Sequence, residues 1–478
     1  MQLTDDNLTL IEPANEDVGK VSKRSENKLS IDESDKLYCR AQHVLPGGTT
    51  RVTVKRTPIP IYMERGEGAY MFDVDGNKYL DFVSNYTVLI HGHAFPPVSD
   101  AIKAQLEHGS CYANPTVTEI ELAELMVERV PAVEKIRFTN SGTEAVMFAI
   151  KAARAFTGRS KIAKLEGAYH GAYDWAEVSE ASTPNNWGGH RPASTPFYQG
   201  VPDSVLDETV VLPFNDIDTS LELILENADE LACILIDVMP SRAGLISLDP
   251  EYLKMLNDVA RANNIVLISD EVLNFRLGYE GISAAFSFRP DLITFGKIIG
   301  GGLPIGAVGG SLQVMSVFDS SKGRPLVPHG GTFAANPLSM VAGLASMKHL
   351  TRESFEHLTA LGDRIRSGIQ DIALRLNLTL CTSGEGSMFR YHLLPSPPKT
   401  SREAFAPPLA ENLHNEISQR MLIYGIVLPS DTSGCCSTAM TFNNIENLLE
   451  RFEQVLREIP DFSNRLSASL AERMNIQR

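Results

Sequence analysis

The chain has 478 residues and a formal net charge of −16; 43% of its residues are hydrophobic and 21% are charged. This length predicts two or three domains with ample cores, and the negative charge argues against non-specific nucleic-acid binding. No apolar run reaches the roughly 18 residues of a membrane-spanning helix. The N-terminus is polar and acidic, and the six cysteines lack metal-ligand spacing, so we expect a cytoplasmic protein with reduced thiols and no metal site.

The first 95 residues contain a polar extension followed by two short patterns. Residues 1–35 are rich in acids, Lys, Asn and Ser, which favours a flexible extension. A short helix is expected over 35–44. Apolar and polar residues then alternate over 62–82 around a turn at 75–77, which predicts a hairpin or meander. We expect residues 36–95 to pack with a small domain formed later in the chain.

Residues 96–345 have the pattern of a large α/β domain. Short apolar runs, which predict buried strands, fall at 136–138, 162–165, 233–236, 265–268, 292–295 and 305–308. Helical patterns fall at 120–129, 143–156, 220–226 and 251–263. This alternation predicts βα units, and therefore a mostly parallel sheet with helices on both faces.

The last part of the chain, residues 346–478, predicts a smaller α+β domain. A long helical stretch comes first, followed by strand-like runs at 388–393 and 425–428 and by a final helix over 445–457. Together with the N-terminal segment, it gives a small domain built from both ends of the chain.

Polar residues follow the predicted strands, at the sheet edge where ligands of open α/β sheets bind. Ser141, Gly142 and Thr143 follow the run 136–138 and open a helix. Backbone N–H groups and small hydroxyl side chains at a helix N-terminus predict a phosphate site. An ordinary N-cap at Ser141 or Thr143 is the simpler alternative, and the two roles are compatible.

Three further side chains are expected at the same edge. Tyr169 lies on the loop after the second run, and Asp270 closely follows the buried run 265–268. A buried carboxylate needs a partner, either a protonated ring nitrogen or an arginine. Lys297 follows the run 292–295 in the stretch DLITFGKIIGGGLPIGAVGG. Partial desolvation lowers the pKa of an amine, which makes Lys297 a candidate Schiff-base former; the alternative is an ordinary loop lysine.

Together these residues match the needs of pyridoxal 5'-phosphate (PLP). The phosphate needs an anchor, the ring needs an aromatic plate and an anionic partner for its nitrogen, and the aldehyde needs a lysine. Each signal is weak alone, but their order and their common placement at one sheet edge are specific. The sequence therefore predicts a PLP enzyme.

The chain resembles the class III aminotransferases, which are PLP enzymes of fold type I. It is most similar to the branch of glutamate-1-semialdehyde aminomutase and the β-phenylalanine aminotransferases. The resemblance runs from about residue 44 to the C-terminal helix and is densest in HVLPGGTTR, RGEGAYMFDVDGNKYLDF, RFTNSGTEAVMFAIKAARAFTGRSKI, YHG, SDEV, ITFGKIIGGGLPIGAVGG and HGGTFAANPLSM. It implies a large PLP-binding domain and a small domain.

The resemblance implies roles for the residues around the cofactor ring. Lys297 forms the Schiff base with PLP and later moves protons, so it is the catalytic residue. Asp270 pairs with the pyridine nitrogen. Val272 packs on one face of the ring and Tyr169 on the other.

The resemblance also implies the phosphate site. Ser141, Gly142 and Thr143 hold the phosphate. Thr332, in GGTF, reaches the phosphate bound to the neighbouring subunit, which implies a homodimer with shared active sites; an ordinary loop hydroxyl is the alternative.

Two residues are expected to bind substrate. Arg51 has the spacing of the arginine that binds a substrate carboxylate in the β-phenylalanine aminotransferases, and a planar guanidinium suits that task. A surface salt bridge is the alternative. Tyr86 lies in a segment that lines the substrate pocket in the family, together with Val88 and Ile90, and their character suggests a hydrophobic or aromatic substrate side chain.

Three departures from the family weaken the aminomutase interpretation. Asp237-Val238 stands where the family usually has Glu-Pro, and the loop 431–436 lacks an acid at the position where the aminomutase has one. A second arginine that some relatives use for a keto-acid acceptor has no clear match.

The leading hypothesis is a PLP-dependent aminotransferase that moves an amino group from an amino acid or amine, such as a β-amino acid, to a keto acid. The alternative is an isomerase on the same scaffold, either an aminomutase or an amino-acid epimerase, which needs no acceptor. A non-catalytic phosphate-binding protein is disfavoured, since no phosphate-loop or dinucleotide-binding motif follows a strand.

Overall fold

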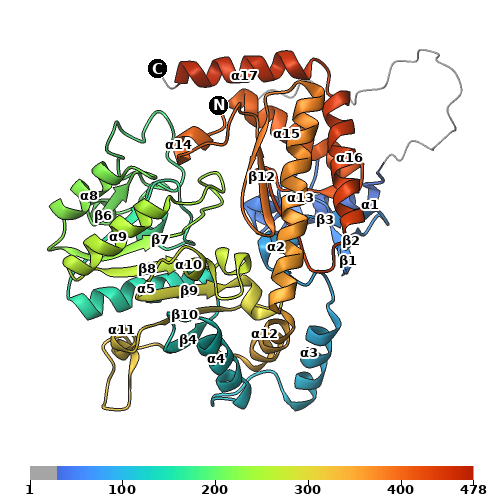
Figure 1. The fold of residues 1–478 in the computed structure, drawn as a ribbon. Coiled ribbons are helices and arrows are strands. Elements are labelled where there is room, and N and C mark those ends of the chain that lie inside the picture. Colours follow the sequence, from blue (N-terminus) through green and yellow to red (C-terminus); the bar gives the residue numbers. More distant parts are fainter. Residues whose placement is uncertain (1–28, 477–478) are drawn as a thin grey trace, which may run out of the picture.

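A computed structural model describes residues 29–476, which form a large α/β domain beside a smaller domain (Figure 1). The sheet of the large domain has the order β4-β10-β9-β8-β7-β5-β6. β10 runs antiparallel to both of its neighbours, and the pairs from β9 to β6 are parallel. The strands are β4 (Lys135–Thr139), β5 (Lys161–Leu165), β6 (Thr209–Leu212), β7 (Leu231–Ile236), β8 (Val266–Asp270), β9 (Leu292–Gly296) and β10 (Gly306–Gly310).

Helices cover both faces of this sheet, as the sequence predicts. The longer helices of this part of the chain are α3 (Pro96–His108), α4 (Val117–Arg129), α5 (Gly142–Thr157), α8 (Ile217–Glu226), α9 (Pro250–Ala262) and α12 (Pro337–His349). Successive residues of β7 pack on opposite faces: Ile234 and Ile236 join the core with Leu256 of α9, whereas Leu235 joins the core with Val146 of α5. A strand that is buried on both faces appears in the sequence as a continuous apolar run, which explains why these strands could be predicted.

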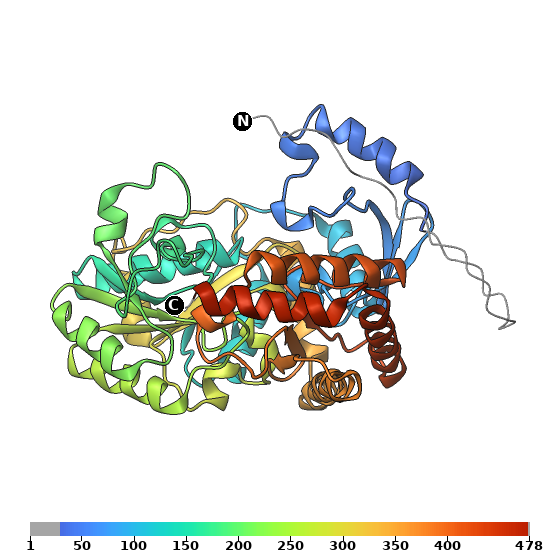
Figure 2. The same cartoon turned by 90° about the horizontal axis from the view of Figure 1, so that it is seen from above.

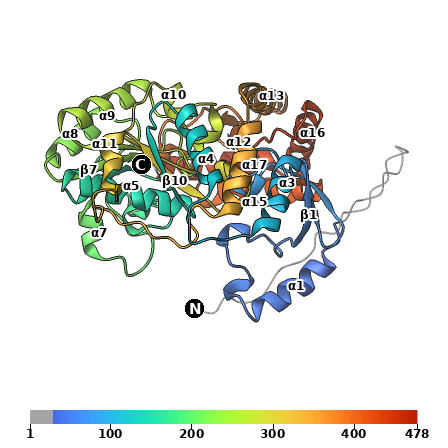
Figure 3. The same ribbon diagram turned by 90° about the horizontal axis from the view of Figure 1, so that it is seen from below.

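The mostly parallel sheet and the six predicted strands are confirmed, but β6 was not predicted. Shorter helical segments also escaped prediction. They are α2 (Ser84–Thr87), α6 (Asp174–Glu177), α7 (Asp203–Asp207), α10 (Ile282–Ala285) and α11 (Leu312–Met315). Figure 3 shows α3, α4 and α12 together, and both α3 and α4 contact α12.

The helix α1 (Asp32–Gln42) begins earlier than the predicted 35–44. The reason is a tertiary cap, because Asp75 accepts hydrogen bonds from the backbone N–H of Glu33 at 2.7 Å and from the hydroxyl of Ser34 at 2.6 Å. The cap satisfies N–H groups that a helix start leaves free. Residues 32–35 therefore belong to α1 and not to the extension, and residues 1–28 lie outside the described part of the chain. Figure 2 shows α1 at the periphery.

The predicted meander is present and is extended by the C-terminal half of the chain. Its antiparallel strands are β1 (Met63–Glu67), β2 (Tyr70–Asp73) and β3 (Lys78–Asp81). β13 (Ile426–Val427) pairs parallel with β3. The two ends of the chain thus share one sheet, as expected for a small domain built from both termini.

The rest of the small domain is a three-stranded antiparallel sheet covered by helices. Its strands are β11 (Cys381–Ser383), β12 (Met388–His392) and β14 (Ser433–Cys435), and its helices are α13 (Arg352–Leu376), α14 (Ser401–Ala404), α15 (Pro408–Ile423), α16 (Phe442–Glu458) and α17 (Phe462–Ile476). The expectation that the helix at 445–457 is the last one was wrong, since α17 follows it and packs on α15. α17 buries only Phe462, Leu466 and Ser469, so its apolar periodicity is faint. No helix among residues 29–476 has the length and apolar character needed to cross a bilayer.

Candidate active site

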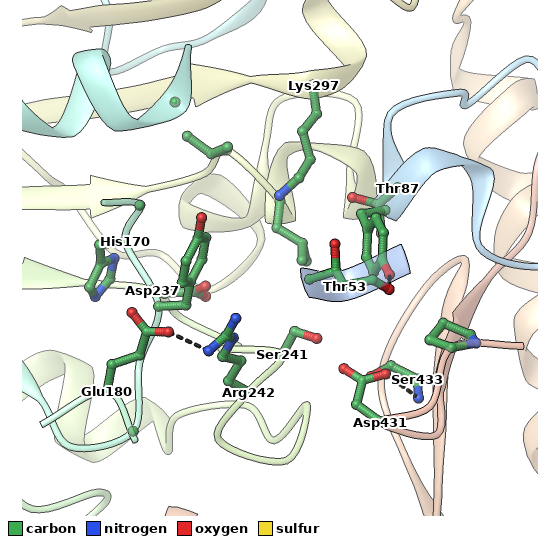
Figure 4. A pocket seen from close by; sticks show the side chains of 18 of the residues that line it. Thr53, Thr87, His170, Glu180, Asp237, Ser241, Arg242, Lys297, Asp431 and Ser433 are labelled. Carbon is green, nitrogen blue, oxygen red and sulfur yellow. Dashed lines mark hydrogen bonds and ion pairs between the residues drawn. The ribbon is translucent and has the colours of Figure 1, made fainter. Parts of the chain in front are cut away.

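A cavity of about 1380 Å³ lies between the carboxyl ends of β5, β7, β8 and β9 and the small domain. Figure 4 shows part of its lining. The structure brings nine of the predicted site residues to this one cavity: Arg51, Tyr86, Ser141, Gly142, Thr143, Tyr169, Asp270, Val272 and Lys297. The tenth, Thr332, is an exposed loop residue before α12 that does not line the cavity of its own chain.

The predicted phosphate cradle lies at the N-terminus of α5. Ser141 is the N-cap, and its hydroxyl accepts the backbone N–H of Glu144 at 3.2 Å. Gly142 is tightly enclosed, because a Cβ there would lie 2.7 Å from Cγ1 of Val272. The hydroxyl of Thr143 accepts the backbone N–H of Ala172 at 3.2 Å. These contacts fix the first turn of the helix, whose N–H groups and dipole suit an anion.

Asp270 at the end of β8 is buried and held as a carboxylate. Its Oδ1 accepts hydrogen bonds from the hydroxyl of Thr294 at 2.9 Å and from the backbone N–H of Val272 at 3.1 Å, and its Oδ2 lies 2.8 Å from Nδ1 of His170. Burial favours the neutral acid, but these hydrogen bonds, led by that of His170, outweigh burial and lower the pKa of Asp270. A carboxylate offers about four acceptor positions, so Oδ2 retains one for a protonated nitrogen.

Lys297 follows β9 directly, and in Figure 4 its side chain extends into the cavity. Its φ of +48° is in the left-handed region, which costs a lysine about 1–3 kcal/mol and is typical of functional sites. Burial lowers the pKa of Lys297, and the opposing effect of the Asp270 and Asp237 carboxylates is smaller. A lowered pKa makes the free amine more available as a nucleophile and base.

The pKa of Asp237, at the end of β7, is shifted in the opposite direction to the pKa of Asp270. It accepts hydrogen bonds from the side chain of Asn274 and, at 2.9 Å, from the backbone N–H of Met239. Burial, together with the negative charge of Asp270, raises the pKa of Asp237 well above its usual value. The pKa values of these two neighbouring carboxyl groups are therefore shifted apart. The shift favours the anion at Asp270 and the protonated acid at Asp237.

Val272 and Tyr169, the two residues predicted to flank the cofactor ring, both line the cavity. Val272 packs against Gly142 and Gly296, where added Cβ atoms would lie 2.7 and 3.1 Å from its Cγ1. The guanidinium of Arg242 lies 4.9 Å from the centre of the Tyr169 ring and is paired with Glu180. Sequence reasoning missed Arg242, because no motif or period marks this loop residue.

The predicted substrate residues lie on the N-terminal wall of the cavity. Arg51 donates a hydrogen bond to the side-chain oxygen of Asn85 at 3.1 Å, and its guanidinium lies 6.0 Å from the centre of the Tyr86 ring. The hydroxyl of Tyr86 donates to the backbone oxygen of Thr53. The expectation that Ile90 helps to line the substrate pocket was wrong, because this side chain is 1% exposed and belongs to the hydrophobic core.

Four consecutive residues of this wall, Ser84–Thr87, have φ between +48° and +75°. Such a left-handed turn is unfavourable for residues with side chains. It is held from both sides, by Asp81, whose carboxylate accepts the backbone N–H of Ser84 at 3.0 Å, and by Arg276, which donates to the backbone oxygen of Thr87 at 3.0 Å. The strain places the Tyr86 ring in the cavity wall.

The observed groups fit PLP. The helix start at Ser141 suits its phosphate, and Val272 and Tyr169 offer an apolar and an aromatic side chain to its ring. Asp270 has one free acceptor position for the pyridine nitrogen, and Lys297 supplies the amine. Within residues 29–476 no cluster of three or more His, Cys, Asp or Glu side chains is arranged to hold a metal ion.

Comparison with known proteins gives consistent results. A family model for class-III aminotransferases matches residues 52–455. A glutamate-1-semialdehyde 2,1-aminomutase from Methanothermobacter thermautotrophicus is 38% identical over 427 residues, which cover 89% of this chain and 99% of the relative.

Two solved structures are also similar. An omega-transaminase from Sphaerobacter thermophilus has a TM-score of 0.87 and 47% identity, covering 89% of this chain and 97% of the other. A β-phenylalanine aminotransferase from Variovorax paradoxus has a TM-score of 0.80 and 30% identity, covering 89% of this chain and 94% of the other.

Proposed function

Because the chain belongs to the class-III aminotransferase family, whose cofactor is PLP, we propose that it is an aminotransferase that moves an amino group from an amino acid or amine to a keto acid. The observation that carries this proposal is the convergence, in one cavity, of the half-buried Lys297, the anionic Asp270 and the guanidinium of Arg51, which lacks an acidic partner among the described residues. Tyr86 and Val88 on the same wall support a hydrophobic or β-amino acid as the donor.

The similarity to a transaminase structure and the size of the cavity support an aminotransferase, whereas the curated relatives support an isomerase. The chain is 47% identical to the omega-transaminase and 38% identical to the aminomutase. A cavity of about 1380 Å³ also has room for donors and acceptors of different size. The aminomutase and epimerase alternatives remain the second candidate, because the aminomutase covers the same share of this chain.

Each residue has a role that follows from its position. When bound, PLP supplies a carbonyl for amines and an electron-accepting ring. Lys297 acts as the nucleophile that holds the cofactor and, once free, removes the proton from the carbon that bears the substrate nitrogen. Asp270 keeps the ring nitrogen protonated. Ser141, Gly142 and Thr143 hold the phosphate at the start of α5.

The remaining residues orient the ring and the substrate. Tyr169 and Val272 would confine the cofactor ring between them. Arg51 binds the donor carboxylate through its planar fork of donors, and Tyr86 packs on the donor side chain. We infer a homodimer in which Thr332 of one subunit reaches the phosphate in the other, which is supported by its exposure outside its own cavity. The six free cysteines support a reducing, cytoplasmic environment.

The test is a half-reaction on the holoenzyme. Single amines and α- and β-amino acids, including aromatic β-amino acids, are added without a keto acid. The visible band of the bound cofactor and the organic product are followed. We expect the band to bleach to the pyridoxamine form while a carbonyl product appears. If the band persists while the amino acid racemises or its amino group migrates, the protein is an isomerase and the proposal is wrong.

A further inference from the structure

Lys164 is a charged residue inside a buried strand. It lies on β5 between Ala163 and Leu165, is 0% exposed, and has one of the largest fully buried side chains of the described chain. Taking an ammonium group out of water is costly, so a lysine is almost never fully buried without specific partners. An apolar residue would fit this position of the strand, and the lysine therefore needs an explanation of its own.

The amine of Lys164 joins two points of the loop that follows β5. Its Nζ donates hydrogen bonds to the backbone oxygen of Val178 at 2.7 Å and to the backbone oxygen of Ala168 at 3.1 Å. Within residues 29–476 neither oxygen accepts another hydrogen bond. Both residues are buried, so an apolar side chain at position 164 would leave two buried carbonyl groups without a donor from the described chain.

Ala168 and Val178 are the two ends of one loop, residues 168–178, which we call the clamped loop. The residues that flank it also meet, because the backbone N–H of Gly167 donates to the backbone oxygen of Ser179 at 2.9 Å. Compact loops whose ends lie close together frequently carry functional residues. Here the buried amine fixes both ends of the loop from below.

The first residues of the clamped loop make contacts throughout the predicted cofactor site. Tyr169 lines the cavity, and Nδ1 of His170 (Figure 4) lies 2.8 Å from Oδ2 of Asp270. That contact leads the interactions that lower the pKa of Asp270. The backbone N–H of Ala172 donates to the hydroxyl of Thr143 at 3.2 Å, at the phosphate cradle. The predicted ring plate, the partner of the carboxylate and a support of the cradle thus come from one short segment.

The hydrogen bonds of Lys164 matter more than its charge. Burial lowers the pKa of Lys164 to about 8, and the opposing effect of the Glu180 and Glu166 carboxylates is smaller. Both acids have other partners, since Glu180 pairs with Arg242 and Glu166 with Arg402. A neutral amine keeps two N–H groups, so each of the two carbonyl groups has a donor in either protonation state. Lys164 therefore acts as a pair of directional donors.

We propose that Lys164 is a positioning residue of the cofactor site: its amine holds both ends of the clamped loop and so sets Tyr169 against the cofactor ring and His170 against Asp270. Lys164 does not line the cavity of the described chain, and it acts through the loop. The inference rests on the proposed roles of Tyr169 and Asp270 toward PLP and deepens them.

The test uses the holoenzyme of Lys164→Met, a change that roughly keeps the length of the side chain and removes its donors. PLP is achiral, so the ellipticity of its visible band reports how the site orients the ring. We expect the variant to lose ellipticity per bound cofactor. Equilibrium dialysis against graded concentrations of PLP should show about 10- to 100-fold weaker binding, because the loop then holds the ring in only a fraction of the molecules.

The matched control is Lys161→Met, at the other end of the same strand. Nζ of Lys161 donates to the side-chain oxygens of Asn227 and Glu230, at 3.1 and 3.0 Å, and has no contact with the clamped loop in the described structure. This variant should keep the wild-type ellipticity and PLP affinity. Lys164→Gln keeps two N–H groups on a shorter side chain. It should lie between wild type and Lys164→Met, and it serves if Lys164→Met does not fold.

Melting temperatures separate positioning from stability alone. A purely structural lysine would lower the melting temperature when replaced and leave the ellipticity and PLP affinity of the folded holoenzyme unchanged, and that result would overturn the proposal. Equal losses in Lys161→Met would also overturn it, because the effect would then not depend on the clamped loop. None of these measurements needs an amino donor. If no amine bleaches the visible band, the aminotransferase proposal fails, and the role of Lys164 is still decided.

Discussion

The two ends of the cavity are built in different ways. At the large-domain end, Asp270 and Lys297 terminate neighbouring parallel strands, and three protein hydrogen bonds fix the Asp270 carboxylate. At the small-domain end, Arg390, His414 and Ser433 come from three separate elements, and each retains an unpartnered atom. We call the large-domain end the preorganised end, because hydrogen bonds within the protein fix its Asp270 carboxylate before any ligand binds. Buried atoms without a partner among the described residues occur at both ends, since Nε2 of His170 and Oδ1 of Asn274 also lack one, so the ends differ in how they are assembled.

Replacing Lys297 by alanine tests the preorganised end with the largest expected effect. The change removes both the nucleophile and the base, so turnover should fall by at least about 10⁴-fold. Binding of PLP should persist, because the phosphate and ring contacts do not involve Lys297. The measurement is turnover together with the absorption spectrum and cofactor retention after gel filtration. If the variant keeps turning over, Lys297 is not the catalytic amine.

Asp270→Asn preserves the shape of the preorganised end and removes its charge. The cofactor ring then loses the anion that keeps its nitrogen protonated, and we expect single-turnover rates with an amine donor to fall by about 10²–10³-fold. Single-turnover kinetics followed at the cofactor band give the rate. Thermal melting is the control for folding. A variant that retains wild-type rates would show that the carboxylate has only a structural role.

Arg51→Gln tests the substrate-facing region and should have a smaller effect. Loss of a charge-assisted fork should raise the KM for carboxylate-bearing donors about 10- to 100-fold, with little change in kcat. An amine donor without a carboxylate provides the internal control, since its kinetics should be unaffected. Equal losses for both kinds of donor would indicate that Arg51 supports the Tyr86 wall and does not bind substrate.

The same contrast explains what could be predicted from the sequence. The strand ends at Asp270 and Lys297 could be predicted because β8 and β9 are buried parallel strands, which appear in the sequence as continuous apolar runs that end at a polar residue. Ser141 could be predicted for another reason, because it stands directly before a helical pattern. Arg390 could not be predicted as a cavity residue, because it lies within a strand-like apolar run and is brought to the cavity only by the fold. The cap of α1 by Asp75 escaped for the same reason, since it joins residues more than forty positions apart.

Asp237→Asn should have the smallest effect on turnover of the four substitutions. It tests whether Asp237 and Asp270, at the ends of neighbouring strands, differ in protonation state. Burial raises the pKa of Asp237, so its proton is held more tightly in the folded than in the unfolded protein. The stability that this group contributes is complete below the unfolded pKa of about 3.9 and is lost as pH rises through the folded pKa.

Asparagine cannot ionise, so the melting temperature of the variant relative to wild type should rise as pH increases from about 5 to about 8, measured by calorimetry. Turnover at neutral pH should change by less than about 3-fold, in contrast to Asp270→Asn, because the amide resembles the protonated acid. Parallel melting curves for the two proteins across this range would mean that Asp237 is ionised in both states. The two carboxyl groups at adjacent strand ends would then share one protonation state, and the assignment of the anionic role to Asp270 alone would fail.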